Sequence, residues 1–149
     1  METPRLRVKV LEHAEGLGLP SYASGGAAGL DLVAAVAATV VLAPGARCAV
    51  PTGLVLGLPP GHEGQVRARS GRALREGLAV LNGPGTIDED YRGELQVLLV
   101  NLGQAPIAIA RGERIAQLVI APVVRVAVEA VAALDDTPRG AQGFGSTGR

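Results

Sequence analysis

Two segments of the sequence carry carboxylates that the formation of a β-strand does not require. Asp31 lies inside the apolar run AGLDLVAA, which is typical of an edge or turn carboxylate, or of an oxygen ligand near a divalent cation. In GTIDEDYRGE (85–94), Asp88 and Asp90 share one face of an extended backbone. Such a cluster is usually a solvated hairpin tip. Apolar Ile87 beside Asp88 also suits a carboxylate whose basicity is tuned for proton transfer.

A second set of residues offers donors to an anion. In ARSGRA, Arg69 carries a planar fork of donors, and Ser70 and Gly71 stand where a strand ends and a short helix begins. Ser70 can cap that helix, so an ordinary helix start and a phosphate site are both open. Gln117, in RGERIAQLVI, is a weaker signal, because a lone glutamine in a strand usually faces solvent.

The C-terminal sequence RGAQGFGSTGR combines glycines with anion-binding groups. Its glycines allow backbone N–H groups to cup an anion, and its polar side chains include Arg139, Ser146 and Thr147. The same composition is typical of a disordered terminus. However, this tail also holds Phe144, the only phenylalanine of the chain.

Short apolar runs predict the strands that position these groups. Strands are expected within 5–13, 32–42, 39–61 with turns at Pro-Gly and Thr-Gly, 64–70, 78–101 as two strands joined by a hairpin, and 106–131 with breaks at Arg111-Gly112 and Ala121-Pro122. Only 70–77 predicts a helix. Many short strands with one small helix favour an all-β barrel or sandwich, which the tail leaves past Leu134.

Composition narrows the classes of protein. The chain of 149 residues suggests one domain, whose core must be aliphatic because aromatic residues make up only 2%. The formal net charge of +0 argues against a nucleic-acid binder that relies on a global basic field. Cys48 is the only cysteine and is expected to be a small core residue. With neither a signal sequence nor a membrane-spanning apolar run, the expected location is the cytoplasm.

Taken in order, five segments resemble the motifs of the trimeric deoxyuridine triphosphatase (dUTPase) family. These segments are AGLDL, RSG, GTIDEDYRGE, RGERIAQ and RGAQGFGSTG. The resemblance runs from Gly29 to Gly148. It implies Mg²⁺-dependent hydrolysis of dUTP to dUMP and pyrophosphate, which limits uracil incorporation into DNA and supplies dUMP for thymidylate synthesis. One departure is Ala141-Gln142, where relatives often carry acidic or glycine residues, which puts the mobility of the tail in doubt.

The resemblance also implies a role for each site residue. Asp88 matches the general base that activates water for attack on the α-phosphorus, and Asp31 matches the aspartate that holds hydrated Mg²⁺ through a water. The uracil and deoxyribose pocket is implied at Asn82, Thr86, Ile87 and Tyr91, where Tyr91 would exclude a 2′-hydroxyl. Phosphate contacts are implied at Arg69, Ser70, Gly71, Gln117, Arg139, Gly145, Ser146 and Thr147. Phe144 would close over the uracil.

The implied architecture is a jelly-roll-like β-barrel with one short helix, assembled as a homotrimer with active sites shared between subunits. It consists of a single domain, 1–149, with a core over 1–137 and a flexible arm over 138–149 that closes over the substrate. Two alternatives stay open: a dCTP deaminase-like enzyme on the same fold, and a non-catalytic trimeric nucleotide-binding module. No nucleic-acid or membrane partner is expected.

Overall fold

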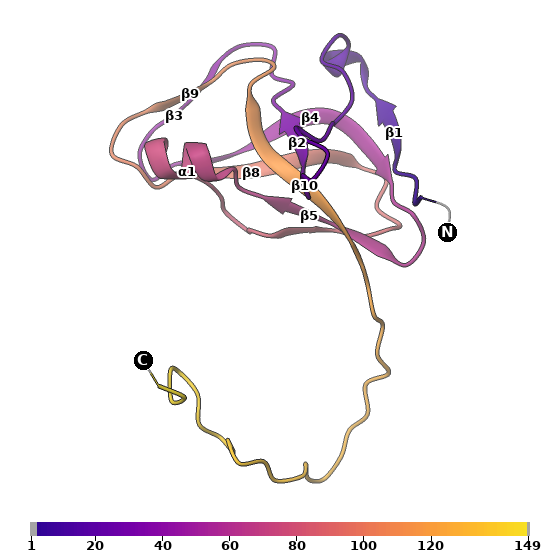
Figure 1. The fold of residues 1–149 in the computed structure, drawn as a ribbon. Helices are drawn as coiled ribbons and strands as arrows, with labels where there is room; N and C mark the ends of the chain where they lie inside the picture. Colours follow the sequence, from indigo (N-terminus) through magenta and orange to yellow (C-terminus); the bar gives the residue numbers. More distant parts are fainter. Residues whose placement is uncertain (1–2, 149) are drawn as a thin grey trace.

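Two four-stranded antiparallel sheets enclose an apolar core in the computed structural model, which describes residues 3–148 (Figure 1). The first sheet has the order β1 (Arg7–Val10), β4 (Arg47–Gly57), β8 (Glu94–Asn101), β6 (Leu78–Val80). The second has the order β2 (Leu30–Val33), β10 (Arg114–Pro122), β5 (His62–Arg67), β7 (Gly85–Ile87). A small sheet pairs β3 (Val40–Leu42) with β9 (Ile107–Ile109). The expected all-β class is confirmed.

The core is aliphatic, as the composition requires. Along β8, Leu95, Val97 and Leu99 are buried while the residues between them are exposed, which is the period of a strand with one face on the core. The largest fully buried apolar side chains of the described residues are Leu32, Leu78, Leu95, Leu99, Ile109, Ile115, Leu118, Val50 and Val97. Both large sheets contribute to this cluster, so their separation is set by interdigitated Leu, Ile and Val.

The turn expected at Thr52-Gly53 is wrong, because β4 continues through it as a bulge. The pairing with β8 shifts between Pro51 and Val55, and Gly53 has a φ of 66°, which favours glycine. The Thr52 hydroxyl donates to the Leu95 carbonyl at 2.5 Å, and the Glu94 carboxylate accepts from the Gly53 N–H at 2.8 Å. Polar groups freed by the bulge are therefore bonded, and the strand does not end.

The hairpin expected over 78–101 is also wrong, because this stretch contains three strands in two sheets. β6 pairs with β8, whereas β7 pairs with β5 of the other sheet. The chain between β6 and β8 thus crosses from one layer to the other and back. Similarly, the strand expected over 32–42 is divided into β2 and β3. Between them, the Ala34 and Ala35 N–H groups donate to the carbonyls of Glu113 and Pro51 instead of joining a ladder.

Two short helical segments accompany the sheets in the described part of the chain: η1 (Glu12–Ala14) and α1 (Ser70–Glu76). The helix expected over 70–77 is confirmed, and Gly77 ends it in the left-handed conformation. The expected cap is not found. Arg69 occupies the N-cap position without a side-chain cap hydrogen bond, and Ser70 is already the first helical residue.

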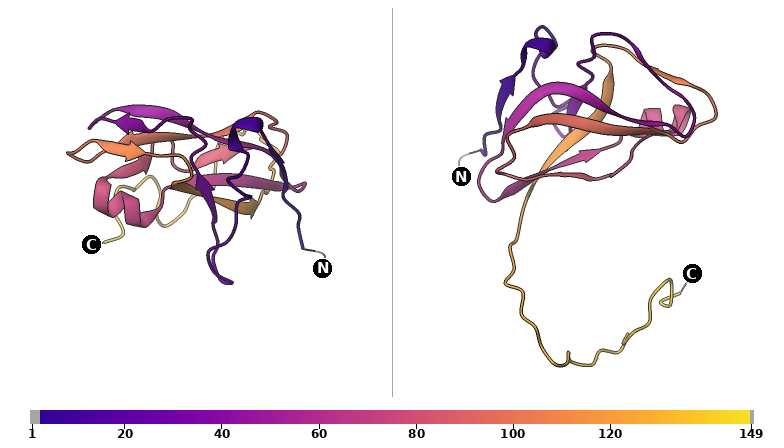
Figure 2. Two further views of the ribbon diagram at one scale, coloured as in Figure 1. Left: turned by 90° about the horizontal axis from the view of Figure 1, so that it is seen from above. Right: turned by 180° about the vertical axis from the view of Figure 1, so that it is seen from behind.

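Beyond β10 the chain leaves the sheets as a long arm (Figures 1 and 2). All of 122–142 is exposed, and the strand expected from 123 to 131 does not form. Its alternating valines have no sheet to join within this chain, so the apolar pattern alone does not produce a strand. The arm therefore separates from the barrel before Leu134. None of the helices in residues 3–148 has the length and apolar character needed to cross a bilayer.

Candidate functional site

Strand pairing brings Asp31, Gln117 and Arg69 together. Gln117 on β10 stands directly opposite Asp31 on β2, and its side-chain amide donates to the Ala68 carbonyl at 2.9 Å. Arg69 Nε lies 3.3 Å from Asp31 Oδ1. A Cβ on Gly29 would lie 3.1 Å from Gln117 Cβ and Cδ, so glycine leaves the space that the glutamine side chain occupies. Three residues from three predicted segments thus form one polar cluster.

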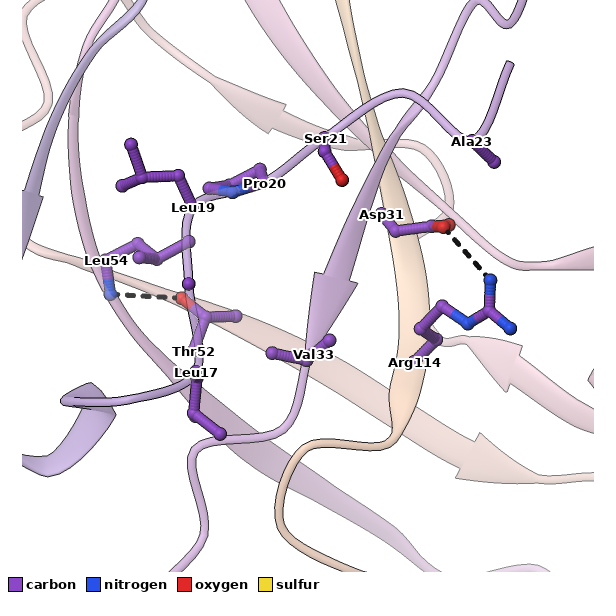
Figure 3. A pocket seen from close by; sticks show the side chains of 11 residues that line it. Leu17, Leu19, Pro20, Ser21, Ala23, Asp31, Val33, Thr52, Leu54 and Arg114 are labelled. Carbon is purple, nitrogen blue, oxygen red and sulfur yellow. Dashed lines mark hydrogen bonds and ion pairs between the residues drawn. The ribbon is translucent and has the colours of Figure 1, made fainter.

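Arg114 also belongs to this cluster, and the sequence interpretation missed it. Its Nη1 lies 3.4 Å from Asp31 Oδ2. Figure 3 shows the two side chains pointing toward each other. Strict alternation would place Arg114 and Gln117 on opposite faces of a strand. The pairing of β10 with β2 shifts between Arg114 and Ala116, and both Ile115 and Ala116 are buried. This bulge turns Arg114 to the face of Asp31. Two consecutive apolar residues, Ile115-Ala116, between polar ones were the available signal.

The charges of this cluster favour an anion. The Asp31 side chain is 18% exposed and has guanidinium groups of Arg69 and Arg114 on two sides. One carboxylate between two arginines leaves a net positive charge at the wall of the cavity that Asp31 and Arg114 line. Guanidinium forks match phosphate oxygens in geometry, so the cluster can bind a phosphate chain. Ser70 and Gly71 follow Arg69 directly, at the start of α1.

The donor set at Asp31 does not form a protein cage for a metal. Within residues 3–148 there is no group of three or more His, Cys, Asp or Glu side chains placed to hold an ion. A lone carboxylate suits Mg²⁺ that keeps its waters and takes its other ligands from substrate phosphates. The residues present therefore fit an ion brought in with a triphosphate, and they do not fit an ion held by protein alone.

The residues expected to form the base and sugar pocket do line one cavity. This cavity has a volume of about 460 Å³, and its walls include Asn82, Thr86, Ile87, Asp88 and Tyr91. Thr86 and Ile87 belong to β7, which pairs only with β5 among the described strands and forms the end of its sheet. Asp88 is the first residue after β7, and its side chain is exposed. A short edge strand thus presents main-chain groups beside a carboxylate.

Tyr91 has a fixed place at this cavity. Its hydroxyl donates to the Glu94 carbonyl at 3.1 Å, and its N–H donates to the Asp88 carbonyl at 3.2 Å. The neighbouring acid, Glu89, turns elsewhere, because its carboxylate accepts from the Gly61 N–H at 2.7 Å. Asp88 and Tyr91 therefore face the same cavity while Glu89 has a separate structural partner.

One chain does not unite all the expected site residues. Asp31 and Arg114 line a cavity of about 350 Å³, shown in Figure 3, which shares no residue with the cavity at Asp88. Residues 138–149 of the arm line neither cavity. Phe144 is fully exposed with a φ of 53°, and Arg139 Nε donates to the Gln142 carbonyl within the arm. Gly145, Ser146 and Thr147 are exposed beside Phe144.

Cys48 takes no part in either cavity. It is half-buried on β4 against the core, and this burial raises the pKa of its thiol. A raised pKa disfavours the thiolate that nucleophilic attack would need. Cys48 thus packs against the core as a partly buried residue and does not belong to the fully buried cluster.

Comparisons with known proteins give one consistent answer. The dUTPase family model matches residues 17–148. A protein of Methylocella silvestris, deoxyuridine 5'-triphosphate nucleotidohydrolase, is 61% identical over 143 residues, which cover 95% of this chain and 89% of that protein.

Solved structures agree with the sequence matches. A mutant dUTPase of Staphylococcus bacteriophage 80alpha with dUpNHpp is 28% identical and has a TM-score of 0.87, covering 99% of this chain and 100% of that one. A mutant dUTPase of phage phi11 of S. aureus, which coordinates a structural Mg(II) ion, is 25% identical with a TM-score of 0.77, covering 87% of this chain and 97% of that one.

Proposed function

The chain belongs to the dUTPase family and hydrolyses dUTP to dUMP and pyrophosphate, and from this premise we propose how its residues divide the work. The observation that carries the proposal is the cavity beside the edge strand β7, with Asp88 directly after the strand and Tyr91 on the same wall.

Uracil is recognised by main-chain groups of β7. Uracil presents an N3–H donor between two carbonyl acceptors, and an edge strand presents alternating N–H and C=O groups of the complementary kind. Thr86 and Ile87 supply these groups, and the Asn82 amide at the cavity wall adds a side-chain donor and acceptor. Cytosine carries the wrong donor at this edge. A close fit of the base against the strand end would exclude the methyl group of thymine.

Asp88 acts as the general base. Its carboxylate is exposed at the cavity, where it can orient a water and take its proton during attack on the α-phosphorus. Tyr91 lies against the deoxyribose and excludes a 2′-hydroxyl. The pyrophosphate leaves once the bond from its bridging oxygen to the α-phosphorus breaks, so its departure depends on groups that neutralise the phosphate charge.

Arg69, Ser70, Gly71 and Gln117 bind the phosphate chain. The positive charge around Asp31 draws the triphosphate to this side of the site. Mg²⁺, when bound, would be held by substrate oxygens and waters that Asp31 accepts from, and would neutralise developing charge. This assignment is supported by the single carboxylate flanked by arginines.

The assembly is a homotrimer in which each site draws on several subunits. Two observations support it: the cavities at Asp31 and Asp88 share no residue, and residues 138–149 of the arm line neither of them in their own chain. From a neighbouring subunit, the arm brings Phe144 onto the uracil. It also brings Arg139, Gly145, Ser146 and Thr147 to the phosphates. We place this enzyme in the cytoplasm, as the sequence analysis expects.

The test is to follow pyrophosphate, ammonia and nucleoside monophosphate from dUTP, dCTP, dTTP and UTP, with and without Mg²⁺. Pyrophosphate and dUMP should appear from dUTP alone and should depend on Mg²⁺. Ammonia from dCTP would instead support a deaminase, and binding without turnover would support a nucleotide-binding module.

A further inference from the structure

Tyr91 has an unusually close neighbour in the main chain two residues later. A Cβ built on Gly93 would lie 2.6 Å from Tyr91 Cζ and 2.9 Å from Cε2, and it would approach the hydroxyl oxygen more closely still. Real Cβ atoms do not approach other heavy atoms at such distances, so the ring occupies the space that any side chain at 93 would need. The φ of Gly93 is outside the left-handed region, so the nearest obstacle to a larger residue is the ring and not the backbone conformation.

Glu94, whose carbonyl accepts the hydrogen bond from the Tyr91 hydroxyl, is itself held in place by several contacts. That hydroxyl donates to the Glu94 carbonyl at 3.1 Å. Glu94 is the first residue of β8, and its side chain is 21% exposed. Its carboxylate accepts from the Gly53 N–H at 2.8 Å and lies 2.6 Å from His13 Nε2. The carboxylate therefore ties the start of β8 to the bulge of β4 and to η1.

The start of β8 is also held in place by the hydrophobic core, through the residue that follows Glu94. Leu95 is only 2% exposed, and its carbonyl accepts from the buried Thr52 hydroxyl at 2.5 Å. The carbonyl that orients Tyr91 thus lies one residue from the packed interior. Tyr91 itself is 45% exposed, so its position depends on these few contacts and not on a surrounding core.

We propose that Gly93 and the Glu94 main chain form a seat that sets the position of the Tyr91 ring, and that Gly93 is thereby a specificity-determining residue for deoxyribonucleotide over ribonucleotide. The seat acts through Tyr91 and does not touch the nucleotide. It rests on the proposed role of Tyr91 at the sugar. A ring pushed off Gly93 toward solvent opens space for a 2′-hydroxyl. The preference for dUTP over UTP then falls.

Gly93→Ala tests the seat with little risk to the fold. The obstructing atoms belong to a side chain that can swing toward solvent, so the ring moves and the backbone stays. We expect thermal unfolding close to that of the wild-type protein. The ratio of kcat/KM for dUTP to kcat/KM for UTP should fall by roughly tenfold or more, the scale of discrimination that pocket shape provides. Gly25→Ala is the matched control, because a Cβ at Gly25 meets nothing within 4 Å.

A double-mutant cycle separates the seat from other effects of the substitution. Tyr91→Ala should lower the selectivity ratio by itself, and Gly93→Ala added to it should change the ratio no further. Tyr91→Phe keeps the ring but removes the donor to the Glu94 carbonyl, so its ratio should lie between those of the wild-type protein and Tyr91→Ala.

Three results would overturn the inference: an unchanged ratio in Gly93→Ala, a further fall in the double variant, or a wild-type ratio in Tyr91→Phe. Failure of the underlying assignment looks different. If Tyr91→Ala keeps the wild-type ratio, Tyr91 does not select the sugar, and both proposals fall.

Discussion

Asp88 is the residue on which the proposed chemistry depends most directly. Asp88→Asn keeps the shape of the side chain and removes its basicity. General-base catalysis contributes about 10²–10⁴-fold, so kcat should fall by that order while dUTP analogues still bind. Steady-state kinetics together with calorimetric binding of a non-hydrolysable analogue measure the two effects separately.

Asp90→Asn is the control for that substitution. Asp90 lies two residues away and is exposed, but it is absent from the walls of the cavity that Asp88 and Tyr91 share. Its amide variant should keep near-normal turnover. If the two variants lost activity equally, the base would have to be assigned to the acidic segment as a whole, and the choice of Asp88 would be wrong.

Arg72 holds α1, the helix that follows Arg69, in place through two ion pairs. α1 has no buried residue and no side-chain cap. Arg72 Nε lies 2.6 Å from Glu76 Oε2, and its Nη1 lies 3.2 Å from Glu113 Oε2 in the turn before β10. Arg72→Met keeps much of the aliphatic stem and removes both ion pairs. We expect a loss of about 1 kcal/mol of unfolding free energy at neutral pH in denaturant titrations.

The same pair predicts a pH dependence. The hydrogen bond from Arg72 lowers the pKa of Glu76 in the folded protein below its ordinary value. As the pH falls, the unfolded chain therefore takes up a proton at Glu76 before the folded protein does, which favours unfolding. The stabilisation is complete above about pH 4.3, the ordinary value for Glu, and disappears as the pH falls through the lower folded value. The stability difference between wild type and Glu76→Gln should therefore shrink in acid. A difference that grew on acidification would contradict this linkage.

At the scale of elements, local patterns predicted strand character well and strand partners poorly. Alternation in GQVRARS and the short helix at SGRALREG depend on neighbouring residues, and both expectations hold. The division of 78–101 between two sheets depends on which distant strand accepts each segment, and alternation carries no such information. Thr52-Gly53 has the composition of a turn, but contacts with Glu94 and Leu95 keep the strand continuous as a bulge.

In the candidate site, too, the sequence predicted local features better than those that depend on strand pairing or on neighbouring side chains. The cavity around Asp88 and Tyr91 comes from residues close in sequence, and it was predicted from one motif. Arg114 was missed because a bulge in β10 reverses the face that alternation assigns to it. Gly93 was quoted in its motif but given no role, because a missing side chain shows its purpose only when its neighbour, the Tyr91 ring, has been placed.

At the scale of the whole molecule, Phe144 has nothing to bury it within its own chain. It is fully exposed, and it lies between glycines that allow the backbone to change direction. If its partner is the uracil base, Phe144→Ala should leave thermal unfolding unchanged and should lower kcat/KM for dUTP. Stacking of a base on an aromatic ring is worth roughly 1–3 kcal/mol, which sets the expected size of the effect. Equal kinetics in the two proteins would show that the ring has no partner in the reaction.

The segment between the barrel and the tail, residues 123–137, exposes a row of valine side chains. Val124, Val126 and Val128 are 87%, 77% and 94% exposed, and their spacing is that of one face of an extended strand. Exposed apolar side chains in such a row are a feature of surfaces that bind another chain. In the proposed trimer, this segment contributes to assembly, whereas residues 138–149 contribute to the reaction. The two parts of the arm should therefore fail differently when removed.

Two truncations test that division. A chain ending at residue 137 should remain trimeric in light scattering with an unchanged Tm, because the polar, glycine-rich tail buries nothing in the barrel. Its turnover of dUTP should nevertheless collapse, since Phe144, Arg139 and the phosphate-binding backbone are gone. A chain ending at Pro122 also loses the valine row, and it should dissociate or melt at a lower temperature. Full activity after the first truncation would make the tail a frayed terminus, and a stable trimer after the second would place the subunit contacts entirely in the barrel.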